Sequence, residues 1–91
     1  INEYSFYGCQ KLRNVEILPD SMLTTIGDNA FERSGIECFY IPKKVSKICK
    51  YAFFYCNKLQ IIEISEYSEI EYIDSTSFSG CPNLIIMKAC Y

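Results

Sequence analysis

The sequence predicts a repeat solenoid, in which short units of the chain coil one above another around a shared apolar core. The first observation is a phenylalanine that recurs at intervals of 25, 22 and 25 residues. The second is a pair of apolar residues, separated by one residue, that follows each phenylalanine at a similar distance. Because one unit is too short to bury its own apolar side chains, the units are expected to stack.

The phenylalanine column defines the unit. A small residue precedes each phenylalanine, an isoleucine lies five residues before it, and a cysteine or serine lies three residues after it. We therefore expect one domain over residues 1–91, with units that start near residues 1, 26, 48 and 73. The second unit lacks one residue at Gly35 and has a shorter turn at Pro42. The phenylalanines are Phe6, Phe31, Phe53 and Phe78.

Each alternating apolar pair predicts a short strand that points both apolar side chains inward, since side chains alternate along a strand. Strands one unit apart would run parallel and form one concave sheet. The segments around the phenylalanines have a three-residue, helix-like spacing but are too short for helices, so turns and 3₁₀ segments are expected on the convex side. The apolar pairs are Val15/Ile17, Phe39/Ile41, Ile62/Ile64 and Met87/Ala89.

Composition excludes several classes of function. The 91 residues are 49% hydrophobic with a net charge of −2, which favours a globular chain without the basic face of a nucleic-acid binder. No apolar run approaches the roughly 20 residues of a membrane-spanning helix. There is no histidine, so Ser/His and Cys/His pairs and most zinc sites are excluded. We therefore expect no enzyme activity, no metal and no cofactor.

The chain starts at Ile1, without an initiator methionine or the layout of a signal peptide. This start indicates a fragment of a longer array.

The six cysteines allow more than one interpretation. Ser34 stands in the column of three of them, which favours a small interior slot that holds buried thiols. A disulfide between Cys56 and Cys81 is the alternative, because adjacent units bring Cα atoms to about 5 Å. A metal site or a cysteine nucleophile is disfavoured, since no ligand set and no base is visible. The column holds Cys9, Cys56 and Cys81, while Cys38, Cys49 and Cys90 lie outside it.

Charged residues gather in corresponding parts of the second and third units. A solvated edge with ion pairs between turns, such as Lys44 with Glu69, is favoured over a ligand site. A carboxylate pair for glycoside chemistry has little support, since nothing marks two acids as sheltered and opposed. The residues are Lys43, Lys44, Lys47 and Lys50, and Glu66, Glu69, Glu71 and Asp74.

The unit resembles the BspA-like class of leucine-rich repeats, which occur in surface proteins of bacteria and parasitic protozoa. The segments that carry the resemblance are IGDNAF at 26–31, FYIP at 39–42, YAFFYCNKL at 51–59 and SFSGCPNL at 77–84. Cys49 and Asp74 stand where this family often has glycine, and Ser65 stands where it often has proline.

The resemblance implies an α/β-type leucine-rich-repeat solenoid and a non-enzymatic protein-binding module of a cell-surface or adhesion protein. Its partner would be a protein, such as a host or extracellular-matrix protein, and its location the cell surface or the extracellular space. An intracellular protein–protein interaction scaffold with the same fold is the alternative.

Leucine-rich-repeat proteins commonly bind partners on the concave sheet, so the residues between the apolar pairs are the candidate site. A flanking column precedes them, in which Ile61 and Ile86 would form a small exposed contact patch beside Tyr40. The candidate partner-binding residues are Glu16, Tyr40, Glu63, Lys88, Ile61 and Ile86.

Overall fold

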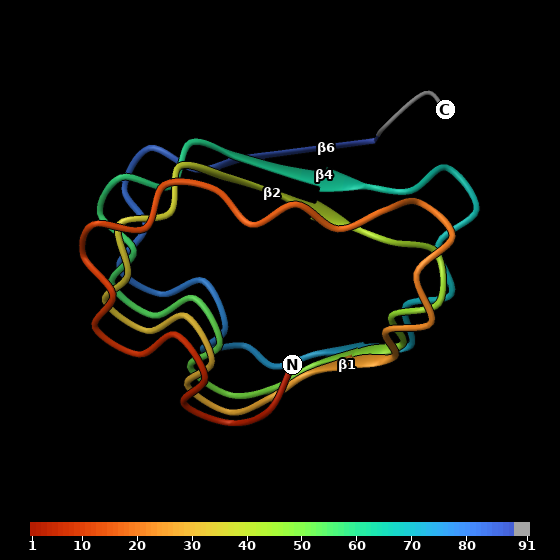
Figure 1. Cartoon of the computed structure of the whole chain (residues 1–91), viewed down its shortest axis with the longest axis horizontal. Coiled ribbons are helices and arrows are strands. Elements are labelled where there is room, and N and C mark those ends of the chain that lie inside the picture. The colour runs from red at the N-terminus through yellow and green to blue at the C-terminus, as the bar shows by residue number, and fades with distance from the viewer. Residues whose placement is uncertain (89–91) are drawn as a thin grey trace.

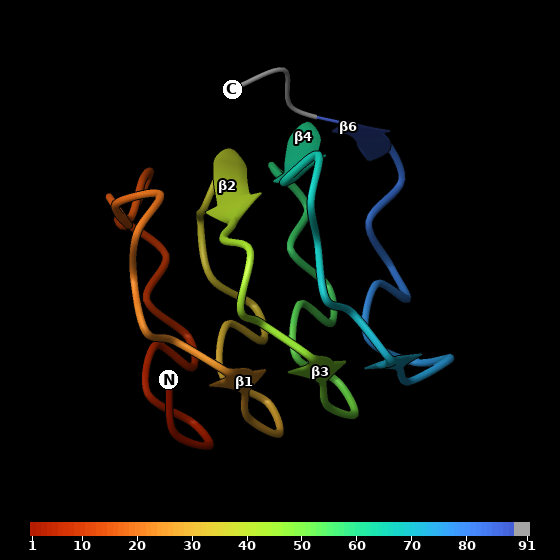
Figure 2. The same ribbon diagram turned by 90° about the vertical axis from the view of Figure 1, so that its right-hand side faces the viewer.

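The computed structural model describes residues 1–88, and this part of the chain contains six short strands and no helix. The strands form two parallel three-stranded sheets, which lie on opposite sides of each turn of the chain (Figure 1). Figure 2 shows the successive turns side by side, from the first unit to the last. One sheet contains β1 (Thr25–Ile26), β3 (Lys47–Ile48) and β5 (Tyr72–Ile73). The other contains β2 (Cys38–Ile41), β4 (Ile61–Ile64) and β6 (Ile85–Lys88).

The prediction of short parallel strands is confirmed, whereas the prediction of a single sheet is wrong. The additional sheet forms at the isoleucine that opens each unit, where Ile26 pairs with Ile48 and Ile48 pairs with Ile73. Its strands are two residues long, too short for an alternating pattern to show in the sequence. The sequence therefore contains no clear signal for this second sheet.

The segments around the phenylalanines are turns rather than 3₁₀ helices. Phe31 and Arg33 donate their N–H groups to the next unit, to the carbonyls of Ala52 (2.7 Å) and Phe54 (2.8 Å). Between them, Glu32 donates to the carbonyl three residues before it, at 3.3 Å. A 3₁₀ helix needs consecutive hydrogen bonds to the carbonyl three residues earlier. Here such bonds alternate with bonds to the next unit, so no 3₁₀ helix forms.

This alternation places left-handed backbone two residues before and two residues after the phenylalanines. Tyr55, for example, has a φ of 52°. A residue other than glycine adopts this backbone conformation only at a cost in free energy. Hydrogen bonds to the next unit, before and after the phenylalanine, hold the backbone in this conformation. Left-handed positions before the phenylalanine are Tyr4, Asn29 and Tyr51, and those after it are Gly8, Arg33, Tyr55 and Gly80.

The four phenylalanine rings stack in one column through the core. Phe6 and Phe31 have ring centroids 5.0 Å apart, Phe31 and Phe53 are also 5.0 Å apart, and Phe53 and Phe78 are 5.2 Å apart. The planes of neighbouring rings differ by no more than 12°. The ring of Phe39 enters from β2 and packs against Phe31 and Phe53 at an interplanar angle of 60°. The stack thereby joins the turns to the sheet.

Burial is deepest in the middle units and decreases toward both ends of the stack. Ile26 and Ile48 are fully buried, whereas Ile73, the next residue in their column, is 40% exposed. Val15 and Ile17 in the first unit are only partly buried, in contrast to Phe39 and Ile41 in the second. Each unit therefore depends on a neighbour on both sides to exclude water from its apolar side chains.

Asp74, which stands where the family often has glycine, organises the last complete turn. Its carboxylate accepts hydrogen bonds from the hydroxyl (2.6 Å) and N–H (2.9 Å) of Thr76 and from the hydroxyl of Tyr72 (2.8 Å). The Thr76 hydroxyl also accepts the N–H of Tyr51 (3.1 Å), a bond that a backbone carbonyl accepts in the earlier units. These bonds, first of all the one from the Thr76 hydroxyl, lower the pKa of Asp74.

We expect Phe53→Ala to lower the free energy of unfolding by about 3–5 kcal/mol, because it removes a fully buried ring from the middle of the stack. Urea denaturation followed by circular dichroism measures the effect. Tyr67→Ala is the control, since its ring is 68% exposed, and it should change the value by about 0.5 kcal/mol or less. An equal loss in both variants would contradict a buried stack.

Asp74→Asn is expected to lower the thermal unfolding midpoint at neutral pH and to have little effect in acid. The stabilisation that accompanies a lowered carboxyl pKa is complete above the unfolded-state value of about 3.9 and disappears as the pH falls through the folded-state pKa. Thermal unfolding between about pH 2 and 7 tests this, with exposed Asp20→Asn as the control. Parallel pH profiles of wild type and D74N would refute the linkage.

Candidate functional site: the outer face of the β2–β4–β6 sheet

The sheet of β2, β4 and β6 has one face toward the core and one outer face. Phe39, Ile41 and Ile62 point inward and are buried. Because side chains alternate along a strand, the residues between them point outward, and the parallel register lines these residues up in two columns. One column holds Cys38, Ile61 and Ile85, and the other holds Tyr40, Glu63 and Met87.

This outer face is mainly apolar and accessible. Ile85 is 61% exposed and Met87 is 47% exposed, while Tyr40, Ile61 and Glu63 are partly exposed. Glu63 is the single ionisable carboxylate of the two columns. Neighbouring strands of a sheet lie about 4.8 Å apart, so these side chains form a continuous platform rather than a pocket. Such a surface, with aromatic and methionine side chains, is typical of protein–protein contacts.

The structure brings three of the predicted site residues together on this face. Tyr40 lies beside Glu63 across β2 and β4, and Ile61 lies two residues before Glu63 on the same side of its strand. Glu16 is exposed but belongs to a segment that forms no strand, so it does not continue the column. The predicted column therefore begins at the second unit.

The positions predicted for Ile86 and Lys88 are wrong by one residue. Ile85, not Ile86, pairs with Ile61, and Met87, not Lys88, pairs with Glu63. Ile86 pairs with Ile62 and so has an inward position in the register, although it remains 49% exposed at this end of the stack. The run from Leu84 to Met87 is apolar at every position, so alternation alone could not fix its register. Ile85 and Met87 are the face residues that the sequence did not identify.

Two of the three column cysteines, Cys56 and Cys81, have hydrogen-bonded thiols. The Cys56 thiol donates to the carbonyl of Phe31 at 2.9 Å, and the Cys81 thiol donates to the carbonyl of Phe53 at 3.0 Å. Ser34, which replaces a cysteine in this column, lies 3.6 Å from the sulfur of Cys56.

Both Cys56 and Cys81 are free thiols in the structure, which supports the thiol interpretation over the disulfide. These groups connect successive units. Cys56 is buried and Cys81 is partly buried, whereas Cys9 is exposed, so the prediction of a buried slot is wrong for Cys9 at the end of the stack.

The environment of Cys56 disfavours its thiolate. Its interaction with the neighbouring Cys81 thiol and its complete burial both raise the pKa of Cys56. A raised pKa reduces the thiolate population at any given pH, and the thiolate is the reactive form of cysteine. Cys56 is therefore suited to structure rather than to nucleophilic chemistry.

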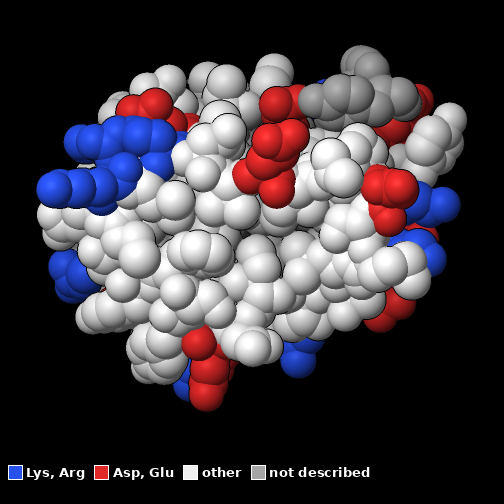
Figure 3. Space-filling view, viewed as in Figure 1, with Lys and Arg blue, Asp and Glu red and all other residues white. Residues whose placement is uncertain are grey.

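The charged groups lie mainly at the periphery. Figure 3 shows the largest group of basic side chains at the upper left margin, with others at the right and the bottom, and acidic side chains in the upper middle of this face. The ion pairs within residues 1–88 join Arg13 to Glu37 (3.7 Å) and Arg33 to Glu32 (3.5 Å). The expected pair between Lys44 and Glu69 is not among them. Instead, the N–H of Glu69 donates to the carbonyl of Lys43 at 2.9 Å.

The described residues contain neither a metal-binding cluster nor a membrane-spanning helix. No group of three or more histidine, cysteine, aspartate or glutamate side chains in residues 1–88 is arranged to hold a metal ion. The same part of the chain has no helix of the length and apolar character needed to cross a bilayer.

A BspA-type leucine-rich repeat region (six copies) matches residues 1–90, so the chain belongs to the BspA-type leucine-rich repeat family. Neither the curated proteins nor the solved structures contain a match to this chain. The family is associated with bacterial surface proteins, and its repeats generally serve as non-enzymatic protein-interaction modules. The fold and the exposed apolar face are consistent with that class.

We expect Cys56 to react with iodoacetamide at least about tenfold more slowly than exposed Cys38 in the native protein. Burial and the raised pKa both slow the reaction. Mass spectrometry of peptides after timed labelling measures the two rates, and labelling in concentrated denaturant should make them similar. Equal native rates would show that the thiol column is open to solvent.

Proposed function

We propose that the chain is a non-enzymatic protein-binding module of a BspA-like cell-surface adhesion protein. In this proposal residues 1–91 form one leucine-rich-repeat solenoid domain, and the partner is a host or extracellular-matrix protein. The observation that carries the proposal is the accessible apolar face formed by the two columns of the β2–β4–β6 sheet. Family membership supports an interaction module of this kind.

The way in which this face would bind follows from its shape. The side chains from Tyr40 to Met87 offer many shallow contacts, and a partner could engage several units at once. Repeated weak contacts raise the overall affinity without a deep pocket. Glu63 lies between Tyr40 and Met87 in its column. Its carboxylate would favour a partner with a basic group at this point of the contact.

An intracellular interaction scaffold with the same fold is the second candidate. The observation that favours it is the set of free thiols, which reducing compartments preserve. Protease treatment of intact source cells separates the two candidates, because only a surface-exposed chain would be digested. Protection from the protease until the cells are lysed would favour the intracellular scaffold.

Substitution on the face tests the binding proposal. Wild-type protein should bind at least one of immobilised collagen, laminin and fibronectin, and Ile61→Asp should weaken that binding about tenfold or more, because it places a charge in the centre of an apolar contact. Surface plasmon resonance gives the dissociation constants. Lys44→Asp is the matched control, since it adds an acid at an exposed turn away from the sheet.

Equal affinities of wild type, I61D and K44D would exclude the β2–β4–β6 face from the contact. Loss of binding in both variants would indicate a diffuse electrostatic contact instead. Circular dichroism of each variant establishes that the fold is retained.

A further inference from the structure

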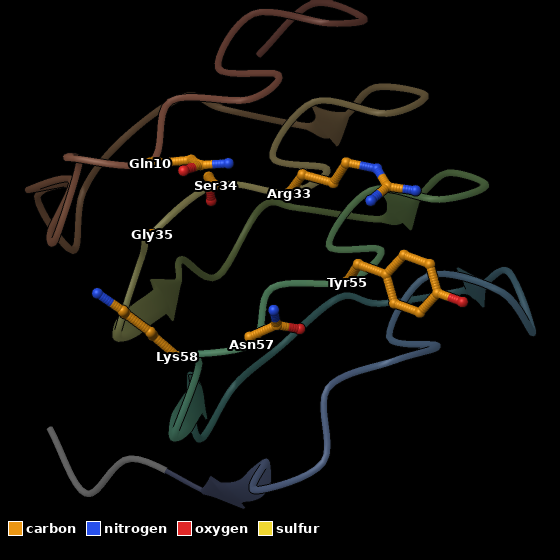
Figure 4. Close-up of a pocket in the computed structure, with 7 residues that line it drawn as sticks. All are labelled: Gln10, Arg33, Ser34, Gly35, Tyr55, Asn57 and Lys58. Carbon is orange, nitrogen blue, oxygen red and sulfur yellow. The ribbon is translucent and has the colours of Figure 1, made fainter.

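A polar hollow of about 450 Å³ opens in the turns of the first three units, beside the start of β2. Figure 4 shows Gln10, Ser34 and Gly35 on one side of it and Asn57 on the other, with Arg33 and Tyr55 together at one end and Lys58 at the opposite end. These seven residues line the hollow.

The hollow coincides with the irregularity of the repeat. Two residues separate the column cysteine from the following leucine in the first and third units, but Gly35 alone separates Ser34 from Ile36 in the second. The shortened turn is held against the first unit, since the N–H of Gly35 donates to the carbonyl of Cys9 at 3.0 Å. A space therefore opens between Gly35 and the longer turn of the third unit.

The chain cannot fill this space with a side chain at position 35. A Cβ atom on Gly35 would lie 2.1 Å from the carbonyl oxygen of Gln10 and 2.5 Å from a guanidinium nitrogen of Arg13. The same Arg13 nitrogen donates to the carbonyl of Gln10 at 2.8 Å and fixes that wall. Backbone contacts therefore fix the Gly35 wall of the hollow.

The charged side chains that line the hollow are cationic. Arg33 and Lys58 line it, and no carboxylate does. The guanidinium of Arg33 is already oriented, since its Nε lies 3.5 Å from a Glu32 carboxylate oxygen and its Cζ lies 4.9 Å from the centroid of the Tyr55 ring. This arrangement engages Nε with Glu32, so a ligand would bond to the Nη groups. The guanidinium at one end of the hollow can bind a carboxylate, and the Lys58 ammonium group at the opposite end adds to the positive charge.

The remaining polar groups that line the hollow can form hydrogen bonds with the hydroxyl groups of a ligand. The side-chain amides of Gln10 and Asn57 each carry donors and an acceptor, so they can bond to hydroxyl groups in either direction. A volume of about 450 Å³ holds a molecule of monosaccharide size and is larger than a simple inorganic ion needs. We propose that the hollow is a binding site for a monosaccharide that carries a carboxylate, of the uronic acid type.

Nuclear magnetic resonance of ¹⁵N-labelled protein tests the site, with glucuronate as the probe. Saturable shifts are expected at the backbone N–H of Gly35 and at the side-chain amides of Gln10 and Asn57. Lys58→Gln should weaken glucuronate binding about tenfold, because it removes one of the two cations. Lys11→Gln is the matched control, since Lys11 is exposed and does not line the hollow, and it should leave the affinity unchanged.

Two further ligands define the specificity. Glucose lacks the carboxylate and should produce no saturable shift at these amides. Glucose 6-phosphate tells a carboxylate site from a general anion site, and it should bind more weakly than glucuronate. Tighter binding of glucose 6-phosphate, saturable binding of glucose, or equal effects of K58Q and K11Q would overturn the proposal.

A second variant tests the structural origin of the site. One asparagine inserted between Gly35 and Ile36 restores the two-residue spacing of the neighbouring units and should close the hollow. Glucuronate binding should then be lost, while the amide spectrum of residues distant from the insertion is retained. If the variant with the inserted asparagine binds glucuronate as tightly as wild type does, the hollow is not the binding site.

Discussion

The fold depends on keeping successive units in register at a spacing of about 5 Å. The four phenylalanine rings repeat at 5.0, 5.0 and 5.2 Å, close to the separation of about 4.8 Å between hydrogen-bonded strands. The two spacings agree because rings and backbone belong to the same turns. The backbone N–H groups of the first three phenylalanines donate to the next unit, for example Phe31 to Ala52 at 2.7 Å and Phe53 to Ser77 at 2.7 Å. Apolar burial and hydrogen bonding therefore specify the same register.

This constraint explains why so much of the architecture could be predicted. The phenylalanine column, the parallel strands at Phe39 and Ile62, and the semi-polar slot of Cys56 all recur at fixed offsets, so the sequence shows them directly. The predictions failed where a feature is too short or too uniform to show a period. The two-residue strand at Ile26 has no alternation, and the run from Leu84 to Met87 has no polar residue to mark its outer side.

The candidate sites differ in the same way. Tyr40, Ile61 and Glu63 could be predicted as neighbours, because their positions follow from strand alternation and unit spacing. The hollow beside Gly35 could not, although the missing residue is visible in the sequence. Its position depends on which neighbouring unit the shortened turn approaches, and only the contacts of Gly35 with Cys9 and Gln10 decide that. A departure from the repeat is thus a place where a ligand can gain access to an otherwise regular surface.

A double-mutant cycle on the stack tests the central claim most directly. Phe31→Leu and Phe53→Leu, alone and together, give the coupling free energy between adjacent rings from urea unfolding. Stacked neighbours should be coupled by about 0.5–1.5 kcal/mol, whereas the same cycle on Phe6 and Phe53, which are two units apart, should give a value near zero. Absence of coupling between Phe31 and Phe53 would contradict the claim that ring stacking holds the units in register.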